Sequence, residues 1–308
     1  MEPQPTPRGG NLPIVSVVMP TYNRRAYIRE SLDSILNQSF RDFEVIVVDD
    51  GSTDGTEEEL RPYRSRILYL YQENRGGAGA HNTGIRHARG QYVAFMDSDD
   101  LATPHHLLHM TDFLERYPQY TMAVGNGAYL EGEYHNRRTI IPSRKAKKLE
   151  RGVGLRDVYD GRVVRMQGTM IRKGPLEEIG LLDDWFRISW DLDLALRVLK
   201  NHRIGFVNEV VYLYRKQGSH VGGDDELRSR ENLRALQKLS ADYPEGVDLI
   251  GRRAFSRLCA YRYCRLARAL AKKGEMEGAR DAMRQAVTLQ PFSLKYRFFQ
   301  YRWAWEIL

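Results

Sequence analysis

Three carboxylates fall within four positions at the end of the stretch YVAFMDSDD, residues 92–100. The apolar run before them is typical of a buried strand, and neighbouring like charges repel one another. Asp97 and Asp99 alternate, so both side chains project to the same side of an extended segment. Such a pair suits a hard divalent cation, Mg²⁺ or Mn²⁺, which keeps other coordination positions for phosphate oxygens. The alternative is that these aspartates cap the helix that follows.

The first 125 residues alternate strand-like and helix-like patterns. The strand patterns cover 14–19, 43–48, 67–71, 91–96 and 121–125, and the helix patterns cover 24–38, 54–61, 77–89 and 104–117. Repeated strand–helix units predict an α/β fold with a mostly parallel, doubly wound, Rossmann-like sheet.

Polar residues follow three of these predicted strands. The segment PTYN (20–23) follows the first strand, Asp49 and Asp50 follow the second, and DSDD (97–100) follows the fourth. Ligands of such sheets bind at the carboxyl ends of the strands, so the three segments are expected to meet at one edge. This convergence favours the metal site over helix capping.

The first strand is not followed by a phosphate-binding loop. Neither GxGxxG nor GxxxxGK[ST] occurs there, which argues against a dinucleotide-binding dehydrogenase. The glycine-rich segment NRGGAGAHNTG (74–84) comes after the third strand instead. Its glycines allow the backbone to approach a ligand closely.

Four segments, in order and spacing, resemble family 2 glycosyltransferases of the GT-A fold: VSVVMPTYNR, FEVIVVDDGSTDGT, NRGGAGAHNTGI and YVAFMDSDD. The resemblance covers about residues 12–220. It implies a metal-dependent, inverting transfer of one sugar from a nucleotide-sugar, usually a UDP-sugar, to a hydroxyl of a saccharide or lipid-linked acceptor. Processive members carry QxxRW and membrane helices, whereas QYRW (300–303) is one residue short, so non-processive transfer is expected.

The resemblance also implies roles for single residues. The nucleotide-binding residues would be Pro20, Thr21, Tyr22, Asp50, Asn74, Asn82 and Asp97, and the metal ligands would be Asp97, Asp99 and His220. Tyr22 would stack on the base and Asp50 would bond to it. The alternatives are a core position for Tyr22, a turn-forming role for Asp50 and a structural role for the lone histidine. His81 stands where the family often has arginine.

An inverting displacement requires a base that takes the proton of the acceptor hydroxyl. In WDLDLALR (190–197), the resemblance assigns that role to Asp191, although Asp191 is also a candidate helix cap. Helical spacing turns Asp193 away from it. Trp190, where the family often has glutamate, Gly168 and Thr169 are the expected acceptor-binding residues.

Three other functions compete with this interpretation. A sugar-nucleotide pyrophosphorylase needs a basic glycine-rich loop after the first strand, and PTYNRR is not one. A glycosidase needs a second carboxylate as partner of Asp191, and none is evident. A catalytically silent, nucleotide-binding scaffold that acts through its helical tail stays open, although the acidic residues of the motifs argue against it.

The chain of 308 residues is expected to have three parts. These are a flexible segment at 1–11, the GT-A domain at 12–226, and a basic helical region at 227–308 with a tetratricopeptide-like helix hairpin. The basic segment at 137–151 is expected to be a loop. Cys259 and Cys264 are five residues apart, which fits neither a metal site nor a disulfide framework.

The net charge of +7 is concentrated in the tail, where 227–308 contains 17 Lys or Arg and 8 Asp or Glu. The end, KYRFFQYRWAWEIL (295–308), interleaves basic and aromatic residues, which suits an anionic membrane surface. The alternative is a helix that closes the core or forms a homo-oligomer interface. No nucleic-acid motif is present. Without a leader or an apolar span, we expect a cytoplasmic protein, peripheral at the inner face of the membrane.

Overall fold

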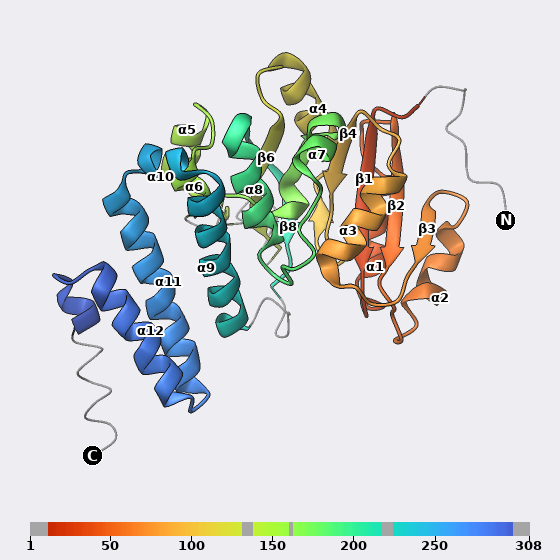
Figure 1. Ribbon diagram of the computed structural model, residues 1–308. Coiled ribbons are helices and arrows are strands. Elements are labelled where there is room, and N and C mark those ends of the chain that lie inside the picture. The colour runs from red at the N-terminus through yellow and green to blue at the C-terminus, as the bar shows by residue number, and fades with distance from the viewer. Residues whose placement is uncertain (1–11, 131–137, 160–162, 217–223, 298–308) are drawn as a thin grey trace. The chain divides into compact units, whose positions relative to one another are not determined.

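The computed structural model describes residues 12–130, 138–159, 163–216 and 224–297 (Figure 1). It divides into two compact units, Met1–Gln217 (unit 1) and Gly218–Leu308 (unit 2). His220 and most of the predicted membrane-binding segment lie outside the described residues. Among the described helices, none combines the length and the apolar character that crossing a bilayer requires.

Unit 1 is built on an eight-stranded sheet with the order β3-β2-β1-β4-β7-β6-β8-β5. The strands are β1 (Val15–Thr21), β2 (Phe43–Asp49), β3 (Leu68–Tyr71), β4 (Tyr92–Phe95), β5 (Leu101–Ala102), β6 (Met122–Tyr129), β7 (Thr169–Arg172) and β8 (Ile204–Tyr214). The predicted mixed α/β class is confirmed. The sheet is less parallel than expected, because β7 runs antiparallel to β4 and β6, and β5 runs antiparallel to β8.

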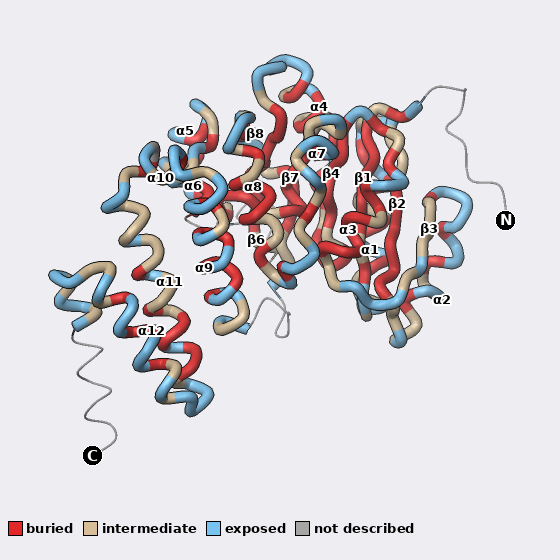
Figure 2. Tube along the Cα trace, viewed as in Figure 1, coloured by how far each residue is buried: buried red, intermediate tan, exposed pale blue. Residues whose placement is uncertain are grey.

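The carboxyl ends of β1, β2 and β4 meet at one edge of the sheet. Thr21 pairs with Asp49 in the parallel ladder, and the Asp50 N–H donates to the Thr21 carbonyl at 2.9 Å. On the other side of β1, the Met96 N–H donates to the Val18 carbonyl at 3.1 Å. These central strands are buried on both faces (Figure 2), as expected for parallel strands covered by helices.

Helices connect and cover the strands of unit 1. They are α1 (Ile28–Leu36), α2 (Thr56–Leu60), α3 (Gly76–His87), α4 (His106–Arg116), α5 (Ser143–Leu149), α6 (Leu155–Tyr159), α7 (Lys173–Ile179) and α8 (Trp190–Asn201). Helix α3 packs on β1 and β2 at Gly84, where a Cβ would lie 2.4 Å from a methyl carbon of Val18. The prediction of a loop at 137–151 is wrong in part, because Ser143–Leu149 form helix α5, which buries Ala146 and Leu149.

Unit 2 consists of helices, namely α9 (Asp225–Asp242), α10 (Pro244–Ile250), α11 (Arg252–Lys272) and α12 (Met276–Leu289). The Asp224 carboxylate caps α9 by accepting from the N–H groups of Glu226 and Leu227. Helices α11 and α12 pack through small residues, among them Ala260, Ala267, Ala279, Ala282 and Ala286. Gly274 joins them with a φ of 82°, which favours glycine.

Candidate active site

The acidic cluster after β4 brings three carboxylates together. Asp97, Asp99 and Asp100 each offer an oxygen atom, and these atoms lie within 4.8 Å of one another. The Asp99 carboxylate accepts from Arg24 Nε at 3.0 Å. The arrangement is an oxygen-only donor set of the kind that hard divalent cations prefer.

Asp100 is held in place by groups from other elements. Its two oxygens accept from the Arg215 N–H and from Gln167 Nε2, each at 2.8 Å. Asp100 therefore ties the end of β4 to the end of β8 and to the turn before β7. Sequence reasoning did not include it among the site residues, because adjacent aspartates give no signal of which one is anchored.

The carboxylates of the cluster repel one another when they are ionised. Burial, followed by repulsion from Asp99 and Asp191, raises the pKa of Asp97 to about 7. Burial and repulsion from Asp97 raise the pKa of Asp100 to about 8. A bound cation would relieve this repulsion. The residues therefore fit a divalent metal ion, with Asp97 and Asp99 as its candidate ligands.

Arg165 is the functional candidate that sequence reasoning missed. It lies before the 3₁₀ turn Met166–Gly168, with its guanidinium carbon 5.0 Å from the centre of the Tyr214 ring. Its charge lowers the pKa of both Asp97 and Asp100, and it attracts Asp191. Its Nε is buried and has no hydrogen-bond partner in the described part of the chain.

The ends of β1 and β2 form a second group of polar residues. Asp50 is buried, and one of its oxygens accepts from Gln72 Nε2 at 2.6 Å and from the Arg75 N–H at 2.9 Å. The Thr21 hydroxyl is buried and unpaired among the residues that the structure describes. Tyr22 follows it and is 45% exposed. Pro20 precedes Thr21 in β1.

The two asparagines of the glycine-rich segment have different surroundings. Asn74 is exposed and its backbone lies against Gly51, next to Asp50. Asn82 is buried, and its amide exchanges two hydrogen bonds with the backbone of Leu182, at 2.8 and 3.0 Å. Asn82 thus holds the segment before α8, and we do not retain it among the nucleotide-binding candidates.

Trp190 begins α8 and packs against the start of α3. A Cβ at Gly77 would lie 2.6 Å from the indole, so only glycine allows this approach. The His81 ring is 6.0 Å from the indole and 5.5 Å from the Phe95 ring. Because a carbonyl only accepts, His81 Nδ1–H must donate to the Gly77 carbonyl at 2.8 Å. The His81 ring is therefore bonded within α3 and packs against Phe95 of β4 and Trp190 of α8.

Asp191 lies in the first turn of α8 and is partly exposed. It accepts from the Leu192 N–H at 2.7 Å, and it lies close enough to Asp97 to raise the pKa of that carboxyl. Asp193 is buried and pairs with Arg197 at 2.7 Å. The two aspartates thus have separate partners, as their helical spacing predicts.

Gly168 and Thr169, the other expected acceptor-binding residues, are buried. A Cβ at Gly168 would lie 2.5 Å from the Tyr212 ring, and the Thr169 hydroxyl donates to the Arg165 carbonyl at 2.8 Å. Gly168 belongs to the turn after Arg165 and Thr169 bonds to the Arg165 backbone, so both residues help to position Arg165. We therefore retain only Trp190 as an acceptor-binding candidate.

Comparisons with known proteins agree with this architecture. The sequence model described as Glycosyl transferase family 2 matches residues 16–180. An uncharacterized glycosyltransferase of Rickettsia typhi is 30% identical over 204 residues, which is 65% of this chain and 63% of that protein. The uncharacterized glycosyltransferase EpsJ of Bacillus subtilis is 31% identical over 216 residues, covering 67% and 62%. The matched region thus spans a little under two thirds of these relatives.

Two solved structures have a similar fold. S. aureus TarS 1-349 in complex with UDP-GlcNAc has a TM-score of 0.60 at 19% identity, and the match covers 90% of this chain and 92% of that one. The mannosyltransferase PcManGT from Pyrobaculum calidifontis, in complex with GDP-Man and Mn²⁺, has a TM-score of 0.62 at 22% identity and covers 99% and 87%. These likenesses confirm the expected GT-A fold.

Proposed function

The chain belongs to glycosyl transferase family 2, and on that premise we propose that it moves one sugar from a nucleotide-sugar, a UDP-sugar, to an acceptor hydroxyl with inversion. The observation that carries the proposal is the meeting of Asp97, Asp99 and Asp191 at the edge where β1, β2 and β4 end. That edge is where sheets of this kind bind their ligands.

In this proposal the donor lies across the ends of β1 and β2. The exposed Tyr22 ring stacks on the base, and the free lone pairs of Asp50 accept from it. Pro20, Thr21 and Asn74 line the same edge, where the unpaired Thr21 hydroxyl gains a partner. The nucleotide-sugars bound by TarS and PcManGT support a donor of this class.

Asp97 and Asp99 are the residues that would hold Mg²⁺ or Mn²⁺. A divalent ion bound there would neutralise the negative charge of the donor's diphosphate. The proposed third ligand, His220, lies outside the described residues. The presence of Mn²⁺ in the PcManGT complex supports metal dependence in this chain.

Asp191 is the proposed base. Its carboxylate takes the proton of the acceptor hydroxyl as the hydroxyl oxygen forms a bond to the anomeric carbon from the face opposite the leaving group. The bond between that carbon and the diphosphate oxygen breaks, and the electron pair leaves with the nucleoside diphosphate. The products are an inverted glycoside and a nucleoside diphosphate.

Arg165 and Trp190 complete the proposed machinery. The Arg165 guanidinium lies among the carboxylates with a buried, unpaired Nε, so it is suited to bind an oxygen of the departing diphosphate. Trp190, beside Asp191, offers its indole to the acceptor sugar. In this proposal the enzyme adds one sugar to a saccharide or to a lipid-linked acceptor and does not extend the product processively.

Replacing Asp191 by Asn tests this function. Turnover of the donor in the presence of acceptor should fall by about 10²–10⁴-fold, because the amide cannot take the proton. The dissociation constant for UDP with Mn²⁺ should stay within about twofold of wild type. Asp184→Asn, on the exposed segment before α8, is the matched control and should keep full turnover. Full turnover of Asp191→Asn would overturn the assignment.

A further inference from the structure

Helix α11 presents a row of positive charge on one face. Its sequence from Arg252 to Lys272 contains seven Lys or Arg and no Asp or Glu. Arg265, Arg268 and Lys272 follow Tyr261 at spacings of four, three and four residues, so the four side chains share one face. Like charges at these spacings destabilise a helix. The row of basic residues therefore does not stabilise α11 itself.

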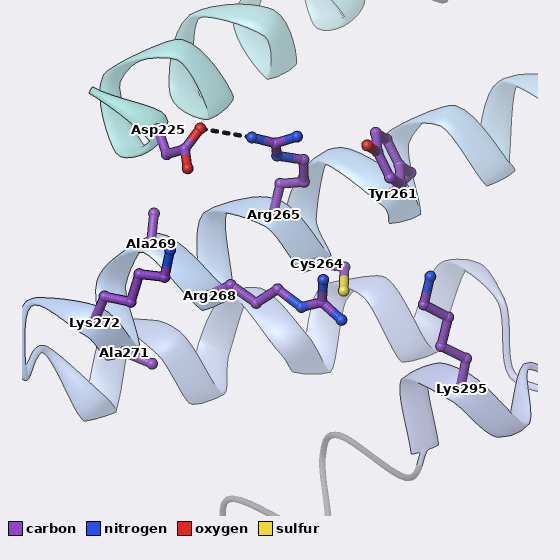
Figure 3. Close-up of a pocket in the computed structure, with 9 residues that line it drawn as sticks. All are labelled: Asp225, Tyr261, Cys264, Arg265, Arg268, Ala269, Ala271, Lys272 and Lys295. Atoms are coloured by element: carbon purple, nitrogen blue, oxygen red, sulfur yellow. Dashed lines mark hydrogen bonds and ion pairs between the residues drawn. The ribbon is translucent and has the colours of Figure 1, made fainter. Parts of the chain in front are cut away.

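This face forms part of a pocket of about 580 Å³ in unit 2 (Figure 3). Lys295, from the segment after α12, contributes a fourth cation, and Asp225 of α9 is the one lining carboxylate. Three small side chains also line the pocket, namely Cys264, Ala269 and Ala271. The volume lies within the range of small-molecule sites and exceeds that of a single phosphate ion.

The pocket lining contains four cationic side chains and one carboxylate. Asp225 pairs with Arg265 at 2.6 Å, which orients that guanidinium (Figure 3). Asp224 and Glu226, its neighbours, pair with Lys273, at 3.7 and 2.7 Å, outside the pocket lining. Among the described residues, Lys272 and Lys295 form no ion pair with a carboxylate. The pocket lining therefore combines a surplus of positive charge with small apolar side chains.

We propose that this pocket binds clustered phosphate groups, either on a chain of linked phosphates or on phospholipid headgroups. Arg265 and Arg268 offer planar donors that match phosphate oxygens, while Lys272 and Lys295 contribute point charges. The site lies wholly within unit 2, whereas the proposed donor residues belong to unit 1. The inference therefore does not depend on the proposed transferase activity.

The test measures binding of tripolyphosphate to the full chain by calorimetry, in EDTA and at low salt. EDTA removes divalent ions, so metal-dependent binding of phosphates at Asp97 and Asp99 does not contribute. We expect one site per chain in the wild type. The double variant Lys272→Glu/Lys295→Glu should raise the dissociation constant at least about tenfold, since hydrogen bonds to charged groups are lost. Both lysines are exposed, so the variant should fold.

The matched control is Arg280→Glu/Arg284→Glu on α12, which makes the same change in net charge outside the pocket lining. It should bind within about twofold of wild type, apart from a general salt-dependent effect. No binding by the wild type, or equal weakening in both double variants, would overturn the proposal. So would much tighter binding of a mixed-sequence RNA than of tripolyphosphate.

A second arm distinguishes the two sources of phosphate. Vesicles of phosphatidylglycerol and phosphatidylcholine are sedimented with the same three proteins. Retention by phosphatidylglycerol that is lost only in Lys272→Glu/Lys295→Glu supports the site and assigns it to headgroups. Tripolyphosphate binding without retention on vesicles supports the site and assigns it to a phosphate chain in solution.

Discussion

Arg165 places positive charge among carboxylates that otherwise repel one another. If it binds the departing diphosphate, Arg165→Gln should lower kcat by about 10²–10³-fold, the loss typical of removing one donor that stabilises developing charge. Arg165→Lys should recover part of this loss, because it keeps the charge without the planar fork. Steady-state kinetics with a saturating donor measures both variants.

A purely structural role for Arg165 predicts a different result. Its contact with the Tyr214 ring and its attraction to the neighbouring carboxylates would then contribute to stability alone. In that case Arg165→Gln would lower the melting temperature while kcat at a permissive temperature stayed near wild type. That pattern would remove Arg165 from the reaction.

Two buried histidines make the free energy of unfolding depend on pH. His81 and His106 each donate Nδ1–H to a carbonyl, of Gly77 and Val211, and the Nε2 of each is buried without a described partner. Protonation would put a charge at that nitrogen, so burial lowers the pKa of each to about 4. Each histidine therefore contributes stability that is present above the unfolded pKa of about 6.5 and is lost as pH falls toward 4.

The variant His106→Gln isolates this effect. The carboxyls of Asp97 and Asp100 have raised pKa values and act in the opposite direction, so the difference from wild type is the useful quantity. Between about pH 7 and pH 5, the unfolding free energy of the variant should gain about 2 kcal/mol relative to wild type. Urea titrations in EDTA measure it. His87→Gln, on the exposed side of α3, should show no such gain.

Single residues were predictable from the sequence where a motif names them. Asp97, Asp99 and Asp191 lie close together and Asp50 follows β2, because each of these residues follows or begins a recognisable element. Arg165 was not predictable, because it belongs to no motif and reaches the site through the turn before β7. The bonds of Asn82 to Leu182 join positions 100 residues apart, which a single sequence cannot indicate.

At the scale of elements, the position of α3 on the sheet depends on Gly84. A methyl group there would lie 2.4 Å from Val18 Cγ1 and 3.3 Å from Val48 Cγ2, both in central strands. Gly84→Ala should therefore reduce the unfolding free energy by about 1–3 kcal/mol through overpacking, despite the better helix propensity of alanine. Chemical denaturation monitored by circular dichroism measures the change.

Gly174 of α7 is the control for this substitution. A Cβ there meets no atom within 4 Å, and its φ is not in the left-handed region. Gly174→Ala should leave stability unchanged or raise it by up to about 1 kcal/mol. Equal effects at the two positions would contradict the close approach of α3 to β1.

The hydrophobic periodicity and the turn-forming residues of the sequence predicted the parallel strands and their helices, because each βα unit is formed by neighbouring segments of the chain. The antiparallel pairing of β7 with β4 and β6 was not predictable in this way. Its contacts are long-range in the chain, as are those of Arg172 in β7, whose guanidinium donates to the carbonyls of Tyr120 and Leu114. Helix α5 was missed because its apolar positions, Ala146 and Leu149, are few among basic neighbours.

At the scale of the whole molecule, the two units differ in charge and in the chemistry they offer. Residues 218–308 contain 17 Lys or Arg and 11 Asp or Glu, whereas unit 1 contains 30 and 29 and gathers three carboxylates in one acidic cluster. Unit 1 is thus suited to a metal-bound diphosphate, and unit 2 to phosphate groups without a metal. Homo-oligomer formation through the helices of unit 2 stays a prediction.

The most direct test of the central claim is the melting temperature with UDP, Mn²⁺, or both, for wild type and Asp99→Asn. A ligand at about 100 times its dissociation constant adds about 2.7 kcal/mol, which corresponds to several degrees at about 2–4 °C per kcal/mol. We predict a shift in the wild type that requires UDP and Mn²⁺ together and that disappears in Asp99→Asn. No Mn²⁺-dependent shift with UDP or any other nucleoside diphosphate, or an equal shift in Asp99→Asn, would contradict a metal-dependent donor site at the acidic cluster.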